Sequence, residues 1–242
     1  MLCTLQAWAD KQKTGWIDSN PFLKKGKIMK YTDILWDFNG TILSDMEIGI
    51  ESVNLLLSQR GKKTLSGLEE YRDVFGFPIY EYYERIGFDF SLEPYDVVAP
   101  LWVEEYMKRM PQAKVFDDVA CVSEAFRAAG LRQTVMSASD LEMLRGQLEF
   151  LGISHLFDDV FGLDNIKAES KVGIAMQWKM NNPQSVSLLI GDTEHDAQVA
   201  SECGFDCILV ARGHQSRATL EKTGFPVVDD LFQVLEYVKK GE

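Results

Sequence analysis

The 242-residue chain contains only four cysteines and three histidines, and it has no long apolar run. The cysteines show no Cys-x-x-Cys spacing, which argues against a zinc site, and we expect reduced thiols rather than disulfides. No stretch approaches the roughly 18 apolar residues that a membrane-spanning helix needs. The sequence therefore predicts a cytoplasmic protein with no membrane partner.

Positive charge is also scarce. Lys and Arg total 25 against 37 Asp and Glu, which leaves a net charge of −12. Nucleic-acid-binding proteins carry clustered positive charge, so no nucleic-acid partner is expected. An anionic substrate would have to be attracted by local groups, because the overall field of the protein repels it.

The first 29 residues lack the continuous apolar segment of a secretory signal. They contain two tryptophans and a basic cluster, and they end at Met29, just before the first predicted strand. Met29 is a candidate natural start, which would make this segment an N-terminal extension. We expect it to be poorly ordered, and a short docked helix is the alternative.

The most informative segment is Ile34-Leu35-Trp36-Asp37-Phe38-Asn39-Gly40-Thr41. Its large apolar residues predict a buried parallel strand. Asp37 follows that strand, and Asn39-Gly40 predicts a tight turn. Such a carboxylate would lie in the crevice where open α/β sheets bind their ligands.

A second acidic strand end follows the apolar run of residues 187–191, where Asp192 and Asp196 lie in a Gly-Asp-x-x-x-Asp pattern. Between the two, Ser137 ends a third predicted strand, and Lys171 begins a helical stretch. Two carboxylate strand ends suit Mg²⁺, which takes oxygen ligands and leaves room for substrate phosphate. A carboxylate nucleophile, a hydroxyl and an ammonium group together suit phosphoryl transfer.

These four motifs, in this order, resemble the haloacid dehalogenase-like hydrolase superfamily, and most closely its phosphoglycolate phosphatase-like branch. The resemblance covers residue 30 to the C-terminus. It implies an α/β fold, with a Rossmann-like parallel sheet core, helices on both faces and an inserted all-α cap domain. It also implies a Mg²⁺-dependent phosphatase that acts on a small phosphorylated metabolite, as a monomer or homodimer.

The spacing of the strands indicates where the cap is inserted. The first strand ends near Asp37, and the next apolar strand begins only near Leu131, whereas a crossover needs about a dozen residues. The intervening sequence has helical periodicity, with breaks at Gly76, Gly87 and Pro94. The expected units are an extension over 1–29, a core over 30–44 and 113–242, and a helical cap over 45–112.

Within those units the sequence predicts a defined set of elements. Cap helices are expected over 48–57, 68–75, 79–86 and 97–110, with hinges near Ser44-Asp45 and Pro111. Core helices are expected over 119–129, 141–151, 172–180 and 231–238. Core strands are expected over 131–137, 160–161, 187–191 and 207–210.

The resemblance implies a role for each motif residue. Asp37 would be the nucleophile that forms an aspartyl-phosphate. The metal ligands would be Asp37, the backbone carbonyl of Asn39, Asp192 and Asp196, the last more through orienting its neighbours than through direct ligation. The phosphate-binding groups would be Thr41, which also fixes the turn, Ser137, the amide of Ala138, and Lys171.

Asn39 departs from the family pattern. Phosphatases of the family carry an Asp there, which protonates the leaving alkoxide and later deprotonates the attacking water. An amide cannot exchange a proton, and acid–base help is worth about 10²–10⁴-fold. Three interpretations stay open: a slow phosphatase that favours good leaving groups, a hydrolase of different chemistry, and a catalytically weakened protein that binds phosphate or metal. The retained motif residues favour the first.

Other candidates are weaker. Lys167 competes with Lys171, which we prefer because it directly precedes a helix. His195 and His214 are expected to be a solvated helix residue and a loop residue, and His155 to be structural. Four cap residues are candidate substrate contacts, although helical spacing makes most of the aromatic ones packing residues: Arg72, Tyr80, Tyr82 and Tyr83.

Overall fold

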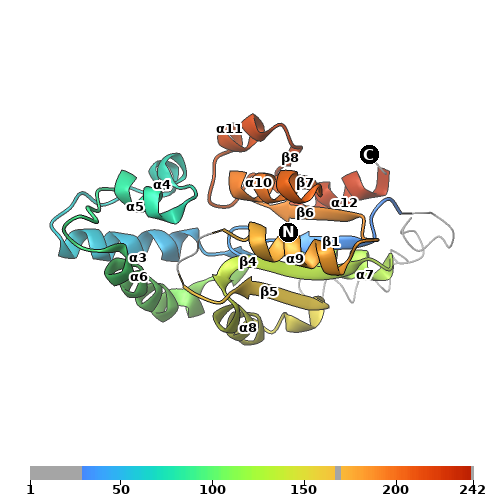
Figure 1. Ribbon diagram of the computed structural model, residues 1–242, viewed down its shortest axis with the longest axis horizontal. Helices are drawn as coiled ribbons and strands as arrows, with labels where there is room; N and C mark the ends of the chain where they lie inside the picture. Colours follow the sequence, from blue (N-terminus) through green and yellow to red (C-terminus); the bar gives the residue numbers. More distant parts are fainter. Residues whose placement is uncertain (1–28, 167–169, 241–242) are drawn as a thin grey trace.

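The structure is a computed structural model, and it describes residues 29–166 and 170–240. Figure 1 shows a sheet with helices against both of its faces and a separate group of helices beyond one end of it. The predictions for residues 1–28 and the alternative lysine Lys167 lie outside the described residues. Met29 is partly buried and packs against the core.

The central sheet has six strands in the order β5-β4-β1-β6-β7-β8, and every neighbouring pair is parallel. The predicted parallel α/β core is therefore confirmed. Its strands are β1 (Asp33–Trp36), β4 (Arg132–Asp140), β5 (Asp159–Leu163), β6 (Ser187–Gly191), β7 (Asp206–Val210) and β8 (Val227–Val228).

Both faces of the sheet are covered because its strands are apolar on both sides. Ile34 and Trp36 of β1 belong to one buried cluster, which includes residues of α7, α8 and α12. Leu35 belongs to a second cluster with residues of α9 and α10. The helices are α7 (Val119–Ala128), α8 (Leu141–Phe150), α9 (Val172–Asn181), α10 (Glu194–Cys203), α11 (Arg217–Leu220) and α12 (Leu231–Lys240), with short turns η3 (Ser154–Leu156) and η4 (Glu221–Thr223).

The regular elements between residues 45 and 112 are helices. This segment contains α3 (Met46–Gln59), α4 (Leu68–Val74), α5 (Ile79–Arg85), α6 (Tyr95–Arg109) and η2 (Met110–Gln112), and it adds no strand to the central sheet over its described length. Its own apolar cluster includes Val53, Leu57 and Val98. These elements agree with the predicted cap, and the division into domains stays a prediction.

A small second sheet joins the two ends of this segment. β2 (Leu43–Ser44) pairs antiparallel with β3 (Lys114–Val115). Sequence patterns do not reveal this pairing, because each strand has two residues and the partners are about 70 positions apart. The sequence patterns also do not reveal β8 and α11, because these elements have only two and four residues.

The cysteines follow the expectation only in part. Cys203 and Cys207 are buried free thiols, as predicted. The prediction is wrong for Cys121, which is disulfide-bonded. Among the described residues no helix is both long and apolar enough to cross a membrane.

Candidate active site

Three adjacent strands deliver the predicted site residues to one edge of the sheet. β1 lies between β4 and β6, so the residues at their carboxyl ends are neighbours. Asp37 follows β1, Ser137 lies in β4, and Asp192 follows β6. All three are buried and line one pocket, together with Lys171 at the start of α9. The convergence follows from the strand order, which the sequence does not state.

Lys171 is the centre of the charged cluster. Its ammonium group contacts Asp37 Oδ1 and lies 2.6 Å from Asp196 Oδ1. Nζ also donates to the carbonyl of Met136 at 3.3 Å. Burial alone would lower the pKa of Lys171, but Asp196 and Asp37 outweigh it and raise that pKa. Lys171 is therefore held charged against the nucleophile candidate.

The carboxylates of Asp37, Asp192 and Asp196 form a possible cation site. One oxygen from each lies within 4.8 Å of the others, and all three residues are buried. Burial raises the pKa of Asp37 well above its ordinary value and that of Asp192 to about 6. The single ammonium group of Lys171 thus faces three buried carboxylates, two of which have a raised pKa. A hard divalent cation fits such an all-oxygen donor set.

Two glycines bring the main chain against Asp192. A Cβ at Gly40 would lie 2.2 Å from Asp192 Oδ2, and one at Gly213 would lie 2.0 Å from it. Gly40 also has a φ of +77°, which residues with side chains seldom adopt. Asp192 itself accepts hydrogen bonds from Thr41 Oγ1 at 3.2 Å and from the backbone N–H of His214 at 2.6 Å. Its carboxylate is fixed by the chain around it.

On the first turn of α10, Asp196 uses one carboxylate oxygen to cap the helix and the other to contact Lys171. Its Oδ2 accepts from the backbone N–H groups of Asp192 and Thr193 at 3.2 and 3.0 Å and from Thr193 Oγ1 at 2.7 Å, which caps the helix. Its Oδ1 faces Lys171. Burial would raise the pKa of Asp196, but Lys171 and Thr193 lower it overall. Asp196 thereby links the β6 strand end to the position of the ammonium group.

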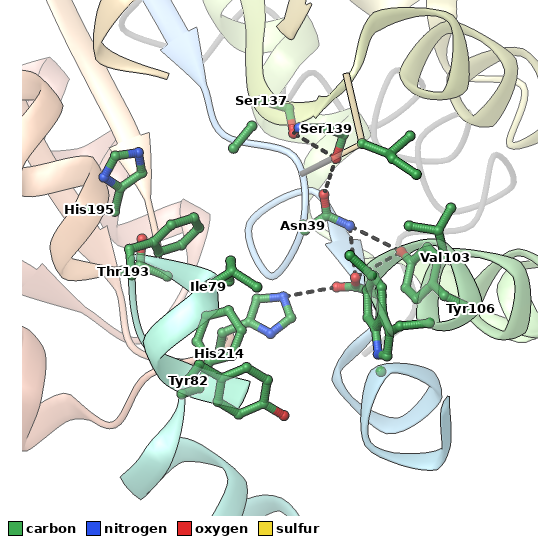
Figure 2. Close-up of a pocket in the computed structure, with 18 of the residues that line it drawn as sticks. Asn39, Ile79, Tyr82, Val103, Tyr106, Ser137, Ser139, Thr193, His195 and His214 are labelled. Atoms are coloured by element: carbon green, nitrogen blue, oxygen red, sulfur yellow. Dashed lines mark hydrogen bonds and ion pairs between the residues drawn. The ribbon is translucent and has the colours of Figure 1, made fainter. Parts of the chain in front are cut away.

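Asn39 is held by a hydrogen-bond network (Figure 2). Its Nδ2 donates to Asp45 Oδ2 at 2.8 Å and to the Tyr106 hydroxyl at 3.0 Å. Its Oδ1 accepts from Ser139 Oγ at 3.1 Å. The amide of Asn39 is thus fixed between the core and α6, and a carboxamide does not act as a general acid or base near neutral pH.

Asp45 and His214 form a buried pair that sequence reasoning missed. His214 Nε2 lies 3.3 Å from Asp45 Oδ1, and its Nδ1 lies 2.6 Å from the Tyr71 hydroxyl. Burial would lower the pKa of His214, but Asp45, Asp192 and Asp37 raise it to about 9. The prediction of a loop position is correct for His214, but the side chain belongs to the site. Asp45, eight residues after Asp37, is the local signal that could have suggested such a partner.

The remaining predicted residues divide between the pocket and its support. Ser137 Oγ donates to Ser139 Oγ at 3.1 Å, and Ser137 and Ala138 both line the pocket. Thr41 is fully buried, and its hydroxyl donates to Asp192 rather than facing the pocket. His155 is exposed and does not line the pocket.

The prediction of a solvated His195 is wrong. The side chain is buried, its ring stacks on Phe77 with centroids 4.4 Å apart, and its Nε2 accepts from the Lys171 backbone N–H at 3.3 Å. Burial and the charge of Lys171 lower the pKa of His195. His195 lies on the buried side of α10, where its ring faces the start of α9.

The segment from α3 to α6 forms the other wall of the pocket, which has a volume of about 140 Å³. Tyr82 and Tyr83 line it, whereas Tyr80 is 41 % exposed and Arg72 donates to the carbonyls of Gly213 and Arg212 at 2.8 and 2.6 Å. The wall is mainly aromatic, with Tyr71, Phe75, Phe77, Tyr95, Trp102 and Tyr106 also contributing.

The parallel α/β sheet, with acidic residues and a lysine at one edge, has the features of a hydrolase. Comparison with known proteins identifies its family. Residues 34–210 match the family model of the haloacid dehalogenase-like hydrolases. The chain belongs to this family, as the motifs predicted.

Individual proteins of known name or structure are similar to this chain over most of its length. A protein provisionally named pyrophosphatase PpaX from Caldanaerobacter subterraneus is 24 % identical, over 87 % of this chain and 96 % of that protein. A phosphoglycolate phosphatase of Pseudomonas syringae is 22 % identical, over 87 % and 80 %. The structure of a haloacid dehalogenase-like hydrolase from Streptococcus pneumoniae has a TM-score of 0.74 at 20 % identity, covering 86 % of this chain and 98 % of that one.

Proposed function

We propose that the protein is a Mg²⁺-dependent phosphatase that acts on a small phosphorylated metabolite through an aspartyl-phosphate on Asp37. The observation that carries this proposal is the Lys171 ammonium held between Asp37 and Asp196, with Asp192 beside them. The relatives named as phosphatases support the same reaction class.

Each residue of the cluster has a role in this reaction. An Asp37 oxygen attacks phosphorus, an O–P bond forms, and the bond from phosphorus to the leaving oxygen breaks with its electron pair. Lys171, the Ser137 hydroxyl and the Ala138 amide would bind the oxygens of the transferring phosphoryl group. Water then attacks the same phosphorus, releases orthophosphate and restores the Asp37 carboxylate.

Mg²⁺ would be held by Asp37, Asp192 and the carbonyl of Asn39, with Asp196 orienting the cluster, and it supplies charge neutralisation for the phosphoryl oxygens. The three buried carboxylates would be poor neighbours for a phosphate dianion without it. Lys171 alone carries one positive charge against them.

Asn39 sets the character of the reaction. Without a proton at this position, an alkoxide must leave with little stabilisation, whereas a phenolate or an acyl phosphate leaving group needs no proton. The rate should therefore depend steeply on the pKa of the leaving group. The second step also lacks its base, so the aspartyl-phosphate should persist.

Asn39 also favours a second candidate, a catalytically weakened protein that binds phosphate and metal without turning over. The two are separated by assaying orthophosphate release from aryl, acyl, alkyl and sugar phosphates with and without Mg²⁺. A phosphatase releases phosphate from some of them only with Mg²⁺, and Asp37→Asn abolishes release. Acid quench with ³²P-labelled substrate should trap label on the wild type and not on Asp37→Asn. Phosphate binding without release or label from any substrate would leave only the weakened protein.

A further inference from the structure

The two sides of the pocket differ in chemistry. The core side carries the charged groups, and the segment from α3 to α6 contributes an aromatic and aliphatic wall. In Figure 2, Ile79 of α5 and Val103 of α6 lie on opposite sides of the space in front of Asn39. Both side chains are half-buried pocket-lining residues. The part of the substrate beyond its phosphate therefore meets this apolar wall.

The wall offers no free cation among the residues that the structure describes. The charged residue that it contributes to the pocket lining is Asp45, which is engaged by Asn39, Tyr106 and His214. Arg72 is turned to the backbone carbonyls of the loop after β7, and Arg85 donates to the carbonyl of Val74. His214, a cation that lines the pocket beside Phe75, is paired with Asp45. A second anionic group on the substrate would therefore be desolvated at this wall without a free cationic partner, which is costly.

Two hydroxyl groups of the wall are already engaged. The hydroxyl of Tyr106 donates to Asp45 Oδ2 at 2.9 Å, and the hydroxyl of Tyr71 lies 2.6 Å from His214. A sugar with several hydroxyl groups would compete with these contacts for partners. An uncharged ring needs none of them.

Stacked ring pairs form the walls on both sides. Phe75 stacks on His214 with centroids 4.8 Å apart, and Phe77 stacks on His195 at 4.4 Å. On the α6 side, Trp102 stacks on Tyr106 at 4.9 Å. Because these rings are already held by their neighbours, little further ordering is needed when a flat ligand packs against them.

We propose that the substrate is a small phosphate ester of an aromatic, phenol-type alcohol, whose ring lies between α5 and α6 while its phosphate lies at Lys171. This inference rests on the proposed function and specifies its substrate class. A second, independent observation agrees with it: Asn39 supplies no proton, and a phenolate leaves without one. The wall and the missing acid select the same substrates by different means, the wall through binding and Asn39 through the chemical step.

Binding of unreactive analogues tests the wall without turnover. The full chain with Mg²⁺ is titrated by calorimetry with orthophosphate, with benzylphosphonate, which mimics phenyl phosphate, and with 3-phosphonopropanoate, which mimics phosphoglycolate. We expect benzylphosphonate to bind at least about tenfold more tightly than the carboxylate analogue. Equal affinities, or a preference for the carboxylate, would overturn the aromatic assignment while leaving the phosphatase intact. If none of the three bound, the phosphate site and the proposed function would fall together with it.

A charge placed in the wall tests its position. Val103→Arg should weaken benzylphosphonate by about tenfold and strengthen 3-phosphonopropanoate, because it adds a cation to the lining and removes an apolar contact. Leu101→Arg is the matched control, since Leu101 lies on the same helix, is 38 % exposed and does not line the pocket. It should change neither affinity. Unchanged binding in Val103→Arg would show that the leaving group does not contact α6.

Discussion

The pocket has two sides, the core side with its charged residues, which forms the floor, and the segment from α3 to α6, which forms the wall. The two are held together by different interactions. On the floor, charged side chains hold one another: Lys171 contacts Asp37 and Asp196, and Asp192 is fixed by Thr41 and the His214 amide. On the wall, aromatic rings pack against one another and against the ring of His214, and the hydroxyl of Tyr106 donates to Asp45. In the proposed reaction the floor would carry out the chemical step, and the wall would select the substrate.

We therefore expect that the floor and the wall can be altered independently by substitution. Among the floor residues, Asp37 and Asp192 follow buried strands, and Lys171 and Asp196 lie at the starts of α9 and α10. The wall residues lie on helices of a segment that adds no strand to the central sheet. Substitutions on the floor should therefore alter the reaction with every substrate, and substitutions on the wall should alter the preference among substrates.

The largest effect is expected on the floor, from Asp192→Asn. The amide fits the same space, with its oxygen accepting from the His214 N–H and its nitrogen donating to Thr41, so the fold should be retained. Loss of a carboxylate ligand should weaken Mg²⁺ binding and lower kcat by about 10³-fold or more. Mg²⁺ titration, kcat and circular dichroism check the three parts. Unchanged Mg²⁺ dependence would remove Asp192 from the site.

Asn39→Asp should have the next largest effect, and it lies where floor and wall meet. The new carboxyl group would lie beside Asp45. Two carboxylates at such a short distance share one proton, so one of them can act as a proton donor. Turnover of an alkyl phosphate should rise by a large part of the 10²–10⁴-fold that acid–base catalysis contributes. The measurement is kcat/KM for one alkyl and one aryl phosphate in both proteins. A flat leaving-group dependence in the wild type, with no gain in the variant, would mean that another group supplies the proton.

His214→Gln tests the buried pair through stability. The folded pKa of His214, about 9, lies above its ordinary value of 6.5, so the pair stabilises the fold fully below pH 6.5 and loses that contribution as the pH rises through 9. The difference in unfolding free energy between wild type and variant should shrink by about 2–3 kcal/mol across that window. Urea unfolding in chelator at pH 6, 7.5 and 9.5 measures it. His155→Gln, at an exposed histidine, is the control, and a pH-independent difference would contradict the pairing.

The smallest effect is expected where the wall is fastened to the core. Arg72→Met removes two hydrogen bonds from α4 to the carbonyls of Gly213 and Arg212, and it should cost about 1–2 kcal/mol of stability. Lys63→Met, in an exposed ion pair of the same segment, should cost nothing measurable. Thermal unfolding of both variants compares them. An equal loss in the two would show that Arg72 does not fasten α4 to the core.

Most elements could be predicted, because their signals are local. The helices over 119–128, 141–150 and 172–181 begin or end within two residues of expectation, and the strands at Asp33–Trp36 and Ser187–Gly191 follow from apolar runs. The pairing of β2 with β3 could not be predicted, because the two strands are short and about 70 positions apart, and β8 was missed because it has only two residues. The inward turn of His195 was missed because one turn of a polar helix does not show which side faces the core.

By itself the sequence determined the strand ends, the motif residues and the class of chemistry. Asp37, Ser137, Lys171, Asp192 and the Asn39 substitution are all visible in a single reading, because each motif is a short segment at the end of an element. Only the folded structure shows that Asp45 pairs with His214 and that the pocket wall is mainly aromatic. Those contacts join residues up to about 170 positions apart, and only the packing of helices against a finished sheet brings them together.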